Sequence, residues 1–175
     1  GSRTYVVKNF SARKTIYYGE VAGELGHYEE NMEEQKWEIT DSTMTILGYE
    51  CLSAETDYHG RHWRVWFTPE IPIHDGPWKL CGLPGIILKA DADNGKYRFE
   101  ATGIEASNKP FPKRMYGHEL SPKVNRKDML NLQWTFYNNS GAQMNAEFGV
   151  YMKDEPLPEG FDLIETDYKN LLKNN

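Results

Sequence analysis

The sequence predicts a mainly β (α+β) fold: an antiparallel, strongly curved sheet or open half-barrel with one short helix. Three observations support this. From Trp37 onward, short β-prone runs recur with turn residues between them. Asn94-Gly95 separates two such runs, which is a strong hairpin signal. Only residues 125–138 show a loosely amphipathic pattern that begins at a residue suited to cap a helix, Asn125.

Strands are expected wherever β-branched and aromatic residues cluster between turn residues. Thr4 to Val7 and Thr15 to Tyr18 predict two short strands, whereas the acidic, glycine-containing stretch 20–35 predicts a loop. The strands expected after it cover residues 36–40, 43–47, 49–55, 62–67, 86–90 and 96–104, with Asp41-Ser42 as a turn between the first two. Alternation in the run 62–67 places Trp63 and Trp66 on opposite faces. A last helical turn is expected in 167–172.

Residues 68–84 interrupt this pattern. They contain Pro69, Pro72, Pro77 and Pro84, and proline removes the N–H that a central strand or a helix interior needs. The segment is therefore an ordered loop or a broken edge strand.

The length and charge of the chain restrict the classes of protein to which it can belong. A chain of 175 residues suits a single β-rich domain over residues 1–175. The formal net charge of −6, without clusters of lysine or arginine, argues against nucleic acid as a partner. No window holds the roughly 18 to 20 apolar residues of a membrane-spanning helix.

Gly1-Ser2 resembles the scar of a cleaved tag, so we expect the C-terminal part of a longer protein.

A rigid binding lip is one interpretation of the proline-rich segment. Trp78 would be its aromatic platform, with Asp75 and Lys79 as polar contacts. The other interpretation is a structural turn that joins two core strands, and the residue pattern favours it. The candidate ligand-binding residues are Arg61, Trp66, His74, Asp75, Trp78 and Lys79.

Metal and catalytic sites are weakly indicated. His59 and His62 lack the ligand spacing of zinc sites, so no metal and no cofactor are expected. No serine lies in a Gly-x-Ser-x-Gly elbow. A hydrolase built from a histidine and an aspartate near the proline-rich loop remains the alternative. A nucleophilic cysteine with His59, His62 or His74 and Asp75 would require reduced thiols. The two cysteines, Cys51 and Cys81, permit one disulfide.

The signature loop Gly82-Leu83-Pro84-Gly85, followed by Ile86-Ile87, resembles the motif of the bacterial GLPGLI family. The blocks Ile46-Leu-Gly-Tyr-Glu-Cys51, Gly60-Arg-His-Trp63, Trp66-Phe-Thr-Pro-Glu-Ile-Pro72 and Asp75-Gly-Pro-Trp-Lys79 are similar to that family in the same order. The resemblance implies an exported cell-envelope or periplasmic protein of the Bacteroidetes, a Gram-negative group, without an established function and without catalytic residues to transfer. Export in turn favours a disulfide between Cys51 and Cys81.

The sequence thus favours a noncatalytic envelope module for binding or scaffolding. Its ligand would be a small apolar or glycan-like molecule, or an envelope protein. The alternative is the hydrolase with a histidine and an aspartate near the proline-rich loop.

Overall fold

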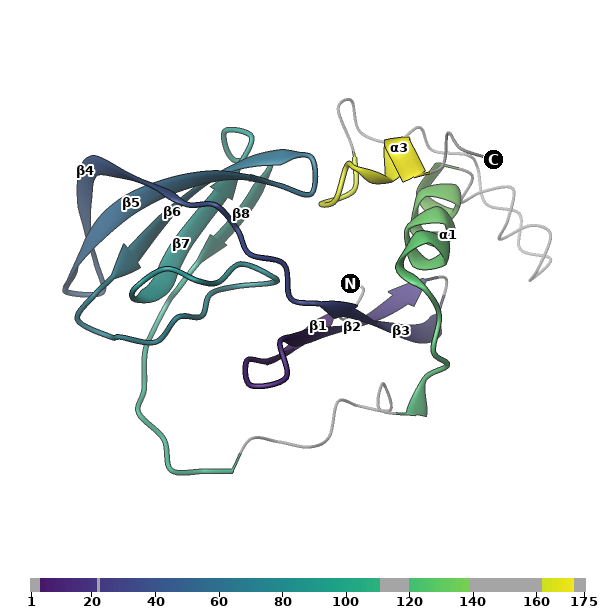
Figure 1. The fold of residues 1–175 in the computed structure, drawn as a ribbon, viewed down its shortest axis with the longest axis horizontal. Helices are drawn as coiled ribbons and strands as arrows, with labels where there is room; N and C mark the ends of the chain where they lie inside the picture. The colour runs from purple at the N-terminus through teal and green to yellow at the C-terminus, as the bar shows by residue number, and fades with distance from the viewer. Residues whose placement is uncertain (1–3, 22, 111–119, 139–161, 172–175) are drawn as a thin grey trace. The chain divides into compact units, whose positions relative to one another are not determined.

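The computed structural model describes residues 4–21, 23–110, 120–138 and 162–171 (Figure 1). The chain divides into two compact units, one formed by residues 1–31 and 113–175 and the other by residues 32–112. Each unit holds one antiparallel sheet, and the few helices lie in the first unit, so the prediction of a mainly β fold is confirmed. The single domain over residues 1–175 stays a prediction.

The first unit is a three-stranded antiparallel sheet with a helix. Its strands pair in the order β1-β2-β3 and its helices follow late in the chain: β1 (Tyr5–Asn9), β2 (Lys14–Val21), β3 (Glu24–Asn31), α1 (Arg126–Asn138) and α3 (Tyr168–Leu171). Tyr17 and Tyr28 stack with ring centroids 5.0 Å apart, and Met129 of α1 packs on them. The burial of this apolar face holds helix and sheet together.

Strand β3 corrects the prediction of a loop over residues 20–35. In β3, Gly26 and Tyr28 face the core, and Glu24 and Glu29 are exposed. A Cβ at Gly26 would lie 3.0 Å from Cε of Met129, so a larger residue at this position would require the Met129 side chain to shift. Local composition suggested a loop, but pairing with β2 and cover by α1 produce a strand.

The predicted helix and the last helical turn are both present. Asn125 caps α1: its Oδ1 accepts a hydrogen bond from the N–H of Asp128 at 2.8 Å. Arg126 donates from Nε to Glu165 at 2.8 Å and from Nη2 to Asp167 at 2.8 Å, and these bonds tie the chain before α3 to the start of α1. Glu165 is 2% exposed, so this ion pair is largely shielded from water.

The second unit is a five-stranded antiparallel sheet in the order β4-β5-β6-β7-β8: β4 (Glu38–Ile46), β5 (Tyr49–Tyr58), β6 (Arg61–Thr68), β7 (Ile86–Ala92) and β8 (Tyr97–Glu100). Figure 1 shows strong twist and curvature, and the edge strands β4 and β8, both fully described, do not pair with each other. The sheet is therefore open, as the predicted curved sheet requires.

Strand β4 corrects the expected turn at Asp41-Ser42. The chain continues as one strand, and the register against β5 shifts between Ile39 and Thr43. This irregularity lets the edge strand bend without breaking. Asp and Ser, which are common in turns, here mark a bulge at a sheet edge.

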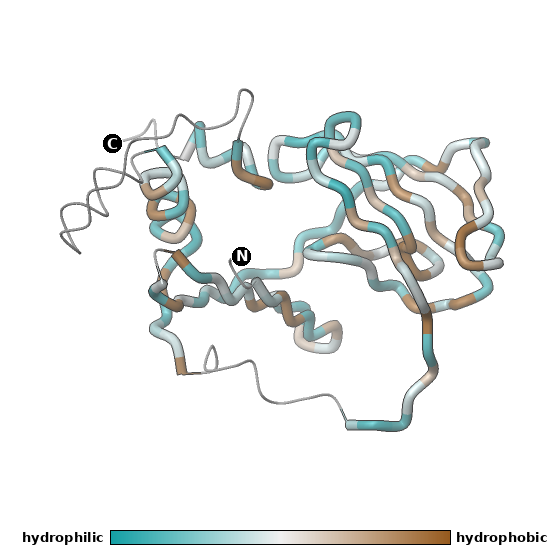
Figure 2. Tube along the Cα trace, turned by 180° about the vertical axis from the view of Figure 1, so that it is seen from behind, coloured by the Kyte–Doolittle hydropathy of each residue, from teal (hydrophilic) through white to brown (hydrophobic). Residues whose placement is uncertain are grey.

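The two faces of the larger sheet differ in character. One face carries Trp63, Val65 and Phe67, all without exposed surface. The other face holds the charged side chains of Arg64 and Lys89, with Trp66 buried beside Ile46, Cys51 and Leu88. Trp63 and Trp66 do lie on opposite faces, and Figure 2 shows hydrophobic and hydrophilic residues alternating along these strands.

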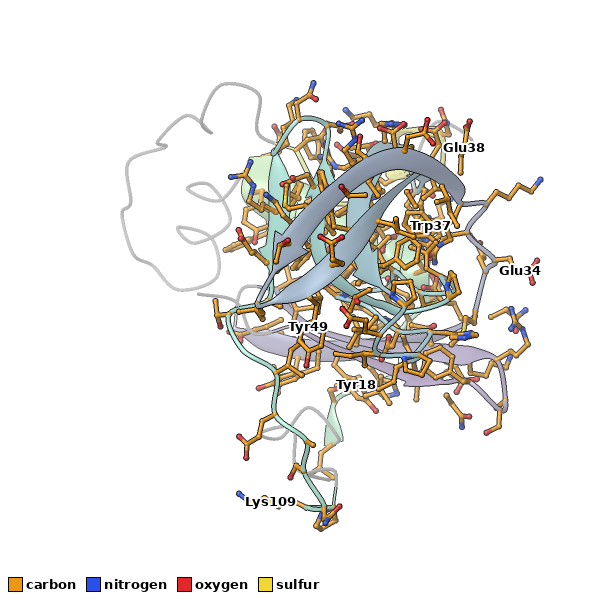
Figure 3. The ribbon with its side chains drawn as sticks, turned by 90° about the vertical axis from the view of Figure 1, so that its left-hand side faces the viewer. Tyr18, Glu34, Trp37, Glu38, Tyr49 and Lys109 are labelled. Carbon is orange, nitrogen blue, oxygen red and sulfur yellow. The ribbon has the colours of Figure 1, made fainter. Side chains whose placement is uncertain are left out.

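The proline-rich loop between β6 and β7 packs through its apolar residues and is held by the segment before β4. Leu80 and Leu83 are fully buried. The Gln35 side chain donates to the carbonyl of Lys79 at 3.0 Å and accepts from the N–H of Cys81 at 2.8 Å. Trp37 donates from Nε1 to the carbonyl of Cys81 at 2.8 Å, and Figure 3 shows its side chain turned inward, whereas that of Glu34 projects away. The loop is a fixed part of the second unit.

Candidate functional site

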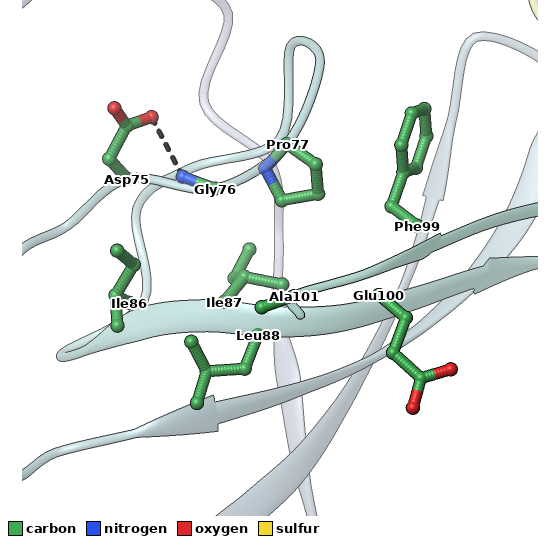
Figure 4. Close-up of a pocket in the computed structure, with 9 residues that line it drawn as sticks. All are labelled: Asp75, Gly76, Pro77, Ile86, Ile87, Leu88, Phe99, Glu100 and Ala101. Atoms are coloured by element: carbon green, nitrogen blue, oxygen red, sulfur yellow. Dashed lines mark hydrogen bonds between the residues drawn. The ribbon is translucent and has the colours of Figure 1, made fainter. Parts of the chain in front are cut away.

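An open pocket of about 350 Å³ lies between the proline-rich loop and the ends of β7 and β8 (Figure 4). Most of its lining is apolar, with one carboxylate residue from the loop and one from β8: Asp75, Gly76, Pro77, Ile86, Ile87, Leu88, Phe99, Glu100 and Ala101. Its volume lies near the lower end of the roughly 300 to 1,000 Å³ range of small-molecule sites. A small ligand group fits such a space.

Backbone hydrogen bonds fix the walls of the pocket. The N–H of Ile87 donates to the carbonyl of Asp75 at 3.0 Å, and the N–H of Ala101 donates to the carbonyl of Leu88 at 2.8 Å. A Cβ on Gly76 would lie 2.7 Å from Cδ1 of Ile87 and 3.0 Å from the carbonyl of Leu80. Only glycine therefore lets the loop run so close to β7.

The side chains of the pocket point in two directions. In Figure 4, Pro77 and Phe99 stand on the same side of β7 above Ile87, and the carboxylate of Glu100 points to the other side. Asp75 accepts a hydrogen bond on Oδ1 from the N–H of Gly76 at 2.7 Å, and Figure 4 shows this carboxylate on the side of the loop away from β7. The pocket thus offers two apolar walls.

Phe99 also belongs to an aromatic cluster on the same face of the sheet. Its ring stacks on Trp63 with centroids 6.2 Å apart, and Trp63 stacks on Trp78 at 5.5 Å. Tyr58 meets the edge of Trp78 at 5.6 Å. Within the described part of the chain, the buried Nε1 atoms of Trp63 and Trp78 have no hydrogen-bond partner. Packing against this cluster restricts the motion of the Phe99 ring.

Of the six candidate residues predicted from the sequence, only Asp75 lines the pocket. Trp78 lies in the aromatic cluster with positive φ, 52°. Lys79 is 3% exposed, with its ammonium 5.7 Å from the centroid of the Trp78 ring. His74 is exposed, and its carbonyl accepts from the N–H of Gly82 at 3.0 Å.

Trp66 and Arg61 lie apart from the pocket. Trp66 is on the opposite face of the sheet, where the cations of Lys89 and Arg64 lie 5.4 and 5.9 Å from its ring centroid. Arg61 is buried and forms an ion pair of 2.6 Å with Asp93 at the hairpin turn. The structure therefore does not bring the six residues together at one surface.

Both cysteines are free thiols, so the expected bridge between Cys51 and Cys81 is not formed in this structure. Cys51 points into the apolar cluster around Trp66, and burial raises the pKa of its thiol, which disfavours the reactive thiolate. Cys81 lies in the loop, where its backbone binds Gln35 and Trp37. The two cysteines thus lie in different elements of the second unit, Cys51 in β5 and Cys81 in the proline-rich loop.

Phe99, Pro77, Ile87 and Ala101 form most of the pocket surface, and the sequence-based candidates did not include them. Alternation over Tyr97–Glu100 separates Phe99 from the charged Arg98 and Glu100, and that signal could have assigned Phe99 to the inner face. The return of the proline-rich loop onto β7 depends on long-range contacts, and no local pattern indicates it.

Comparison with sequence families gives one match, described as N-glycanase peptide, N-terminal domain, over residues 23–132. This range is well over half of the chain. The chain belongs to this family. The matched range includes the whole pocket and the aromatic cluster.

Solved structures show a similar fold. Two crystal forms of PNGF-II, in space groups C2 and P21, align with TM-scores of 0.54 and 0.53 at 20% and 21% identity. In each case, the alignment covers 77% of this chain and 25% of the PNGF-II chain, so the chain spans about a quarter of that protein. A search of curated proteins found no match. Among the described helices, none is long and apolar enough to cross a membrane.

Proposed function

We propose that this domain is a noncatalytic glycan-binding module of an exported protein, and that the pocket beside Phe99 is its binding site. The observation that carries the proposal is the apolar corner formed by Pro77, Ile87 and Phe99 in a pocket whose lining also includes Asp75. Membership of a family named for an N-glycanase supports a glycan as the ligand.

A sugar ring suits this corner for physical reasons. Its C–H groups form an apolar face that can pack on an aromatic ring, and its hydroxyls at the ring edge donate hydrogen bonds to carboxylates. Phe99 offers the ring, and Asp75 is the loop residue of the lining that carries a carboxylate. The stacking of Phe99 on Trp63 holds its ring in place, so binding costs little side-chain entropy.

The geometry favours binding over hydrolysis. Glycosidases place two carboxylates on either side of one bond, facing the substrate. Here the Glu100 carboxylate points to the side of β7 away from Phe99, so it does not converge with Asp75. The hydrolase alternative would depend on His74 and Asp75, and His74 is exposed, so burial does not fix the position of its side chain.

Export to the cell envelope is the setting that we propose for this module. The support is the resemblance of the signature loop Gly82 to Gly85 to the GLPGLI family of envelope proteins. An envelope glycan or glycoprotein is then an accessible partner.

Titration calorimetry of the complete chain with a galactose-terminated biantennary N-glycan tests the proposal. We expect saturable binding, and we expect Phe99→Ala to weaken it at least tenfold because the stacking platform is lost. Phe10→Ala is the matched control: Phe10 is 44% exposed just after β1 in the first unit, and its removal should leave the affinity unchanged.

Two results would contradict the proposal. One is the absence of binding by a wild-type chain whose cooperative thermal unfolding shows that it is folded. The other is equal loss of affinity in Phe99→Ala and Phe10→Ala. Mass spectrometry of the glycan after incubation distinguishes binding from cleavage, and an intact glycan is the expected result.

A further inference from the structure

We infer that the free edge of β8 is a self-association surface, on which a second copy of this chain pairs as an antiparallel strand in a register centred on Phe99. Three features of β8 point to this partner: the direction of its outward backbone groups, the alternation of opposite charges along it, and the aromatic residue between those charges. Such a dimer forms whether or not the protein binds glycans.

The backbone of β8 has hydrogen-bonding groups that its neighbour β7 does not use. Strand β8 (Tyr97–Glu100) ends the five-stranded sheet, and among the described strands only β7 pairs with it. The N–H of Ala101 donates to the carbonyl of Leu88 at 2.8 Å, so the backbone of Ala101 faces β7. Alternate residues of an antiparallel strand face its partner. The N–H and C=O groups of Arg98 and Glu100 therefore point to the free edge, where a further strand can bond to them.

The side chains along this edge are accessible to a partner. The Arg98 side chain is 58% exposed, and Glu100 is exposed as well. Just beyond the strand, a Cβ on Gly103 would meet no atom within 4 Å. Figure 4 shows the Glu100 carboxylate on the side of the sheet opposite to Phe99. The two charged side chains thus share one face of β8, and Phe99 belongs to the other, as strand alternation requires.

The charges favour one register for the second copy. With Phe99 opposite its own equivalent, Arg98 of each copy lies opposite Glu100 of the other, and both residues have outward backbone groups. Each such pair combines backbone hydrogen bonds with opposite charges side by side, which stabilises antiparallel strands. A register centred on Arg98 or on Glu100 would instead place two like charges opposite each other, which is unfavourable.

The same register brings the two Phe99 residues together on the inner face. They form a pair that is not hydrogen-bonded, in which the Cα atoms of antiparallel strands approach to about 4.5 Å and the side chains are closest. Phe99 is half-buried within one chain, so this contact buries apolar surface that is still exposed. Because Phe99 also lines the pocket, the dimer places the pockets of the two copies side by side.

The other edge of the sheet, β4, lacks these features. Its register against β5 shifts between Ile39 and Thr43, and such an irregularity disturbs pairing with a further strand. The charged residues of β4, Glu38 and Asp41, are both acidic. No register of two β4 strands therefore places opposite charges together.

Sedimentation equilibrium of the complete chain tests whether it self-associates. Strands of this length form a small contact compared with stable interfaces, which bury roughly 1,200 to 2,000 Å². We therefore expect a weak dimer, with an average mass that rises from monomer towards dimer as the concentration approaches about 1 mM.

Charge reversal tests the edge and the register. Arg98→Glu and Glu100→Arg each place like charges opposite each other, so each variant alone should self-associate at least tenfold more weakly than the wild type. In an equimolar mixture, the two acidic groups of one variant lie opposite the two basic groups of the other. The mixture should therefore associate with about the wild-type affinity.

Arg64→Glu is the matched control. The Arg64 side chain is 48% exposed and pairs with Glu55 at 2.8 Å within the sheet, away from the β8 edge, so its reversal should leave self-association unchanged. Cooperative thermal unfolding of each variant shows that it is folded. A chain that stays monomeric up to about 1 mM overturns the inference. A mixture that associates no better than its separate variants, or an equal loss in Arg64→Glu, also overturns it, and none of these results bears on glycan binding.

Discussion

Gly85 ends the proline-rich loop at a point where the backbone has no room for a side chain. A Cβ there would lie 2.1 Å from the carbonyl oxygen of Thr68 and 2.8 Å from the nitrogen of Pro69. Both neighbours are backbone atoms that strand pairing holds, since Thr68 is opposite Ile86 in the sheet. The final glycine of the signature loop is therefore required by packing rather than by a ligand.

We predict that Gly85→Ala lowers the free energy of unfolding by about 3 kcal/mol, because the backbone must shift to remove the overlap. Urea denaturation measures the change. Gly103→Ala is the control: no atom lies within 4 Å of a Cβ at that position, so an effect below about 0.5 kcal/mol is expected. Equal effects of the two substitutions would show that crowding at Gly85 is not the cause.

At the scale of elements, two aspartates of the hairpin of β7 and β8 pair with arginines that differ in their exposure to water. Asp93 meets Arg61, whose side chain is 2% exposed, at 2.6 Å. Asp91 meets Arg98, whose side chain is 58% exposed, at 2.7 Å. Burial opposes ionisation of Asp93, but hydrogen bonds from Arg61 and from the N–H of His62 outweigh it, so the pKa of Asp93 is lowered.

We predict that Asp93→Ala destabilises the protein by about 2 kcal/mol at pH 7, because it removes a carboxylate from a buried guanidinium. Asp91→Ala should cost less than about 1 kcal/mol, since its partner is in water. The measurement is urea denaturation of both variants beside the wild type. A larger effect for Asp91→Ala would contradict this ranking by burial.

The lowered pKa also gives the pair a pH dependence with a definite sign. The stabilisation by Asp93 is fully present above the pKa of the unfolded chain, about 4, and is lost as the pH falls through the lower folded-state pKa. Between pH 6 and pH 3 the wild type should therefore lose more stability than Asp93→Ala. Parallel curves would show that Asp93 does not contribute to the acid transition.

The elements themselves were predictable to different degrees. The helix 125–138 and the hairpin around Asn94-Gly95 depend on capping and turn residues, and the structure confirms both. Strand β3 was missed because its glycines and glutamates have low β-propensity, and it forms through pairing with β2 and contact with α1.

At the scale of the whole molecule, the first unit is assembled from both ends of the chain. Residues 1–31 and 113–175 are joined through the roughly 80 residues of the second unit. If the second unit unfolds, it becomes a flexible loop whose closure costs the first unit about 4 kcal/mol. This dependence supports the prediction of one domain over residues 1–175.

We predict that the two units unfold in one transition. Trp134 of α1 belongs to the first unit and the other tryptophans, Trp37, Trp63, Trp66 and Trp78, to the second. In Trp134→Phe, fluorescence therefore follows the second unit alone, while ellipticity at 222 nm includes the helices of the first. Coincident urea midpoints are the expected result, and clearly separate midpoints would indicate two domains.

The sequence by itself determined the mainly β class, the helix, the central hairpin and the opposite orientation of Trp63 and Trp66, because these follow from local turn chemistry and from the two-residue period of a strand. Only the tertiary structure decided where the pocket lies. Phe99 and Pro77 are 22 positions apart, and they meet because the proline-rich loop folds back on β7, where Gly76 leaves room for it. The proline-rich loop, a candidate site from the sequence, thus forms one wall of the pocket. The opposite wall comes from β8, in whose residues the sequence analysis found no binding motif.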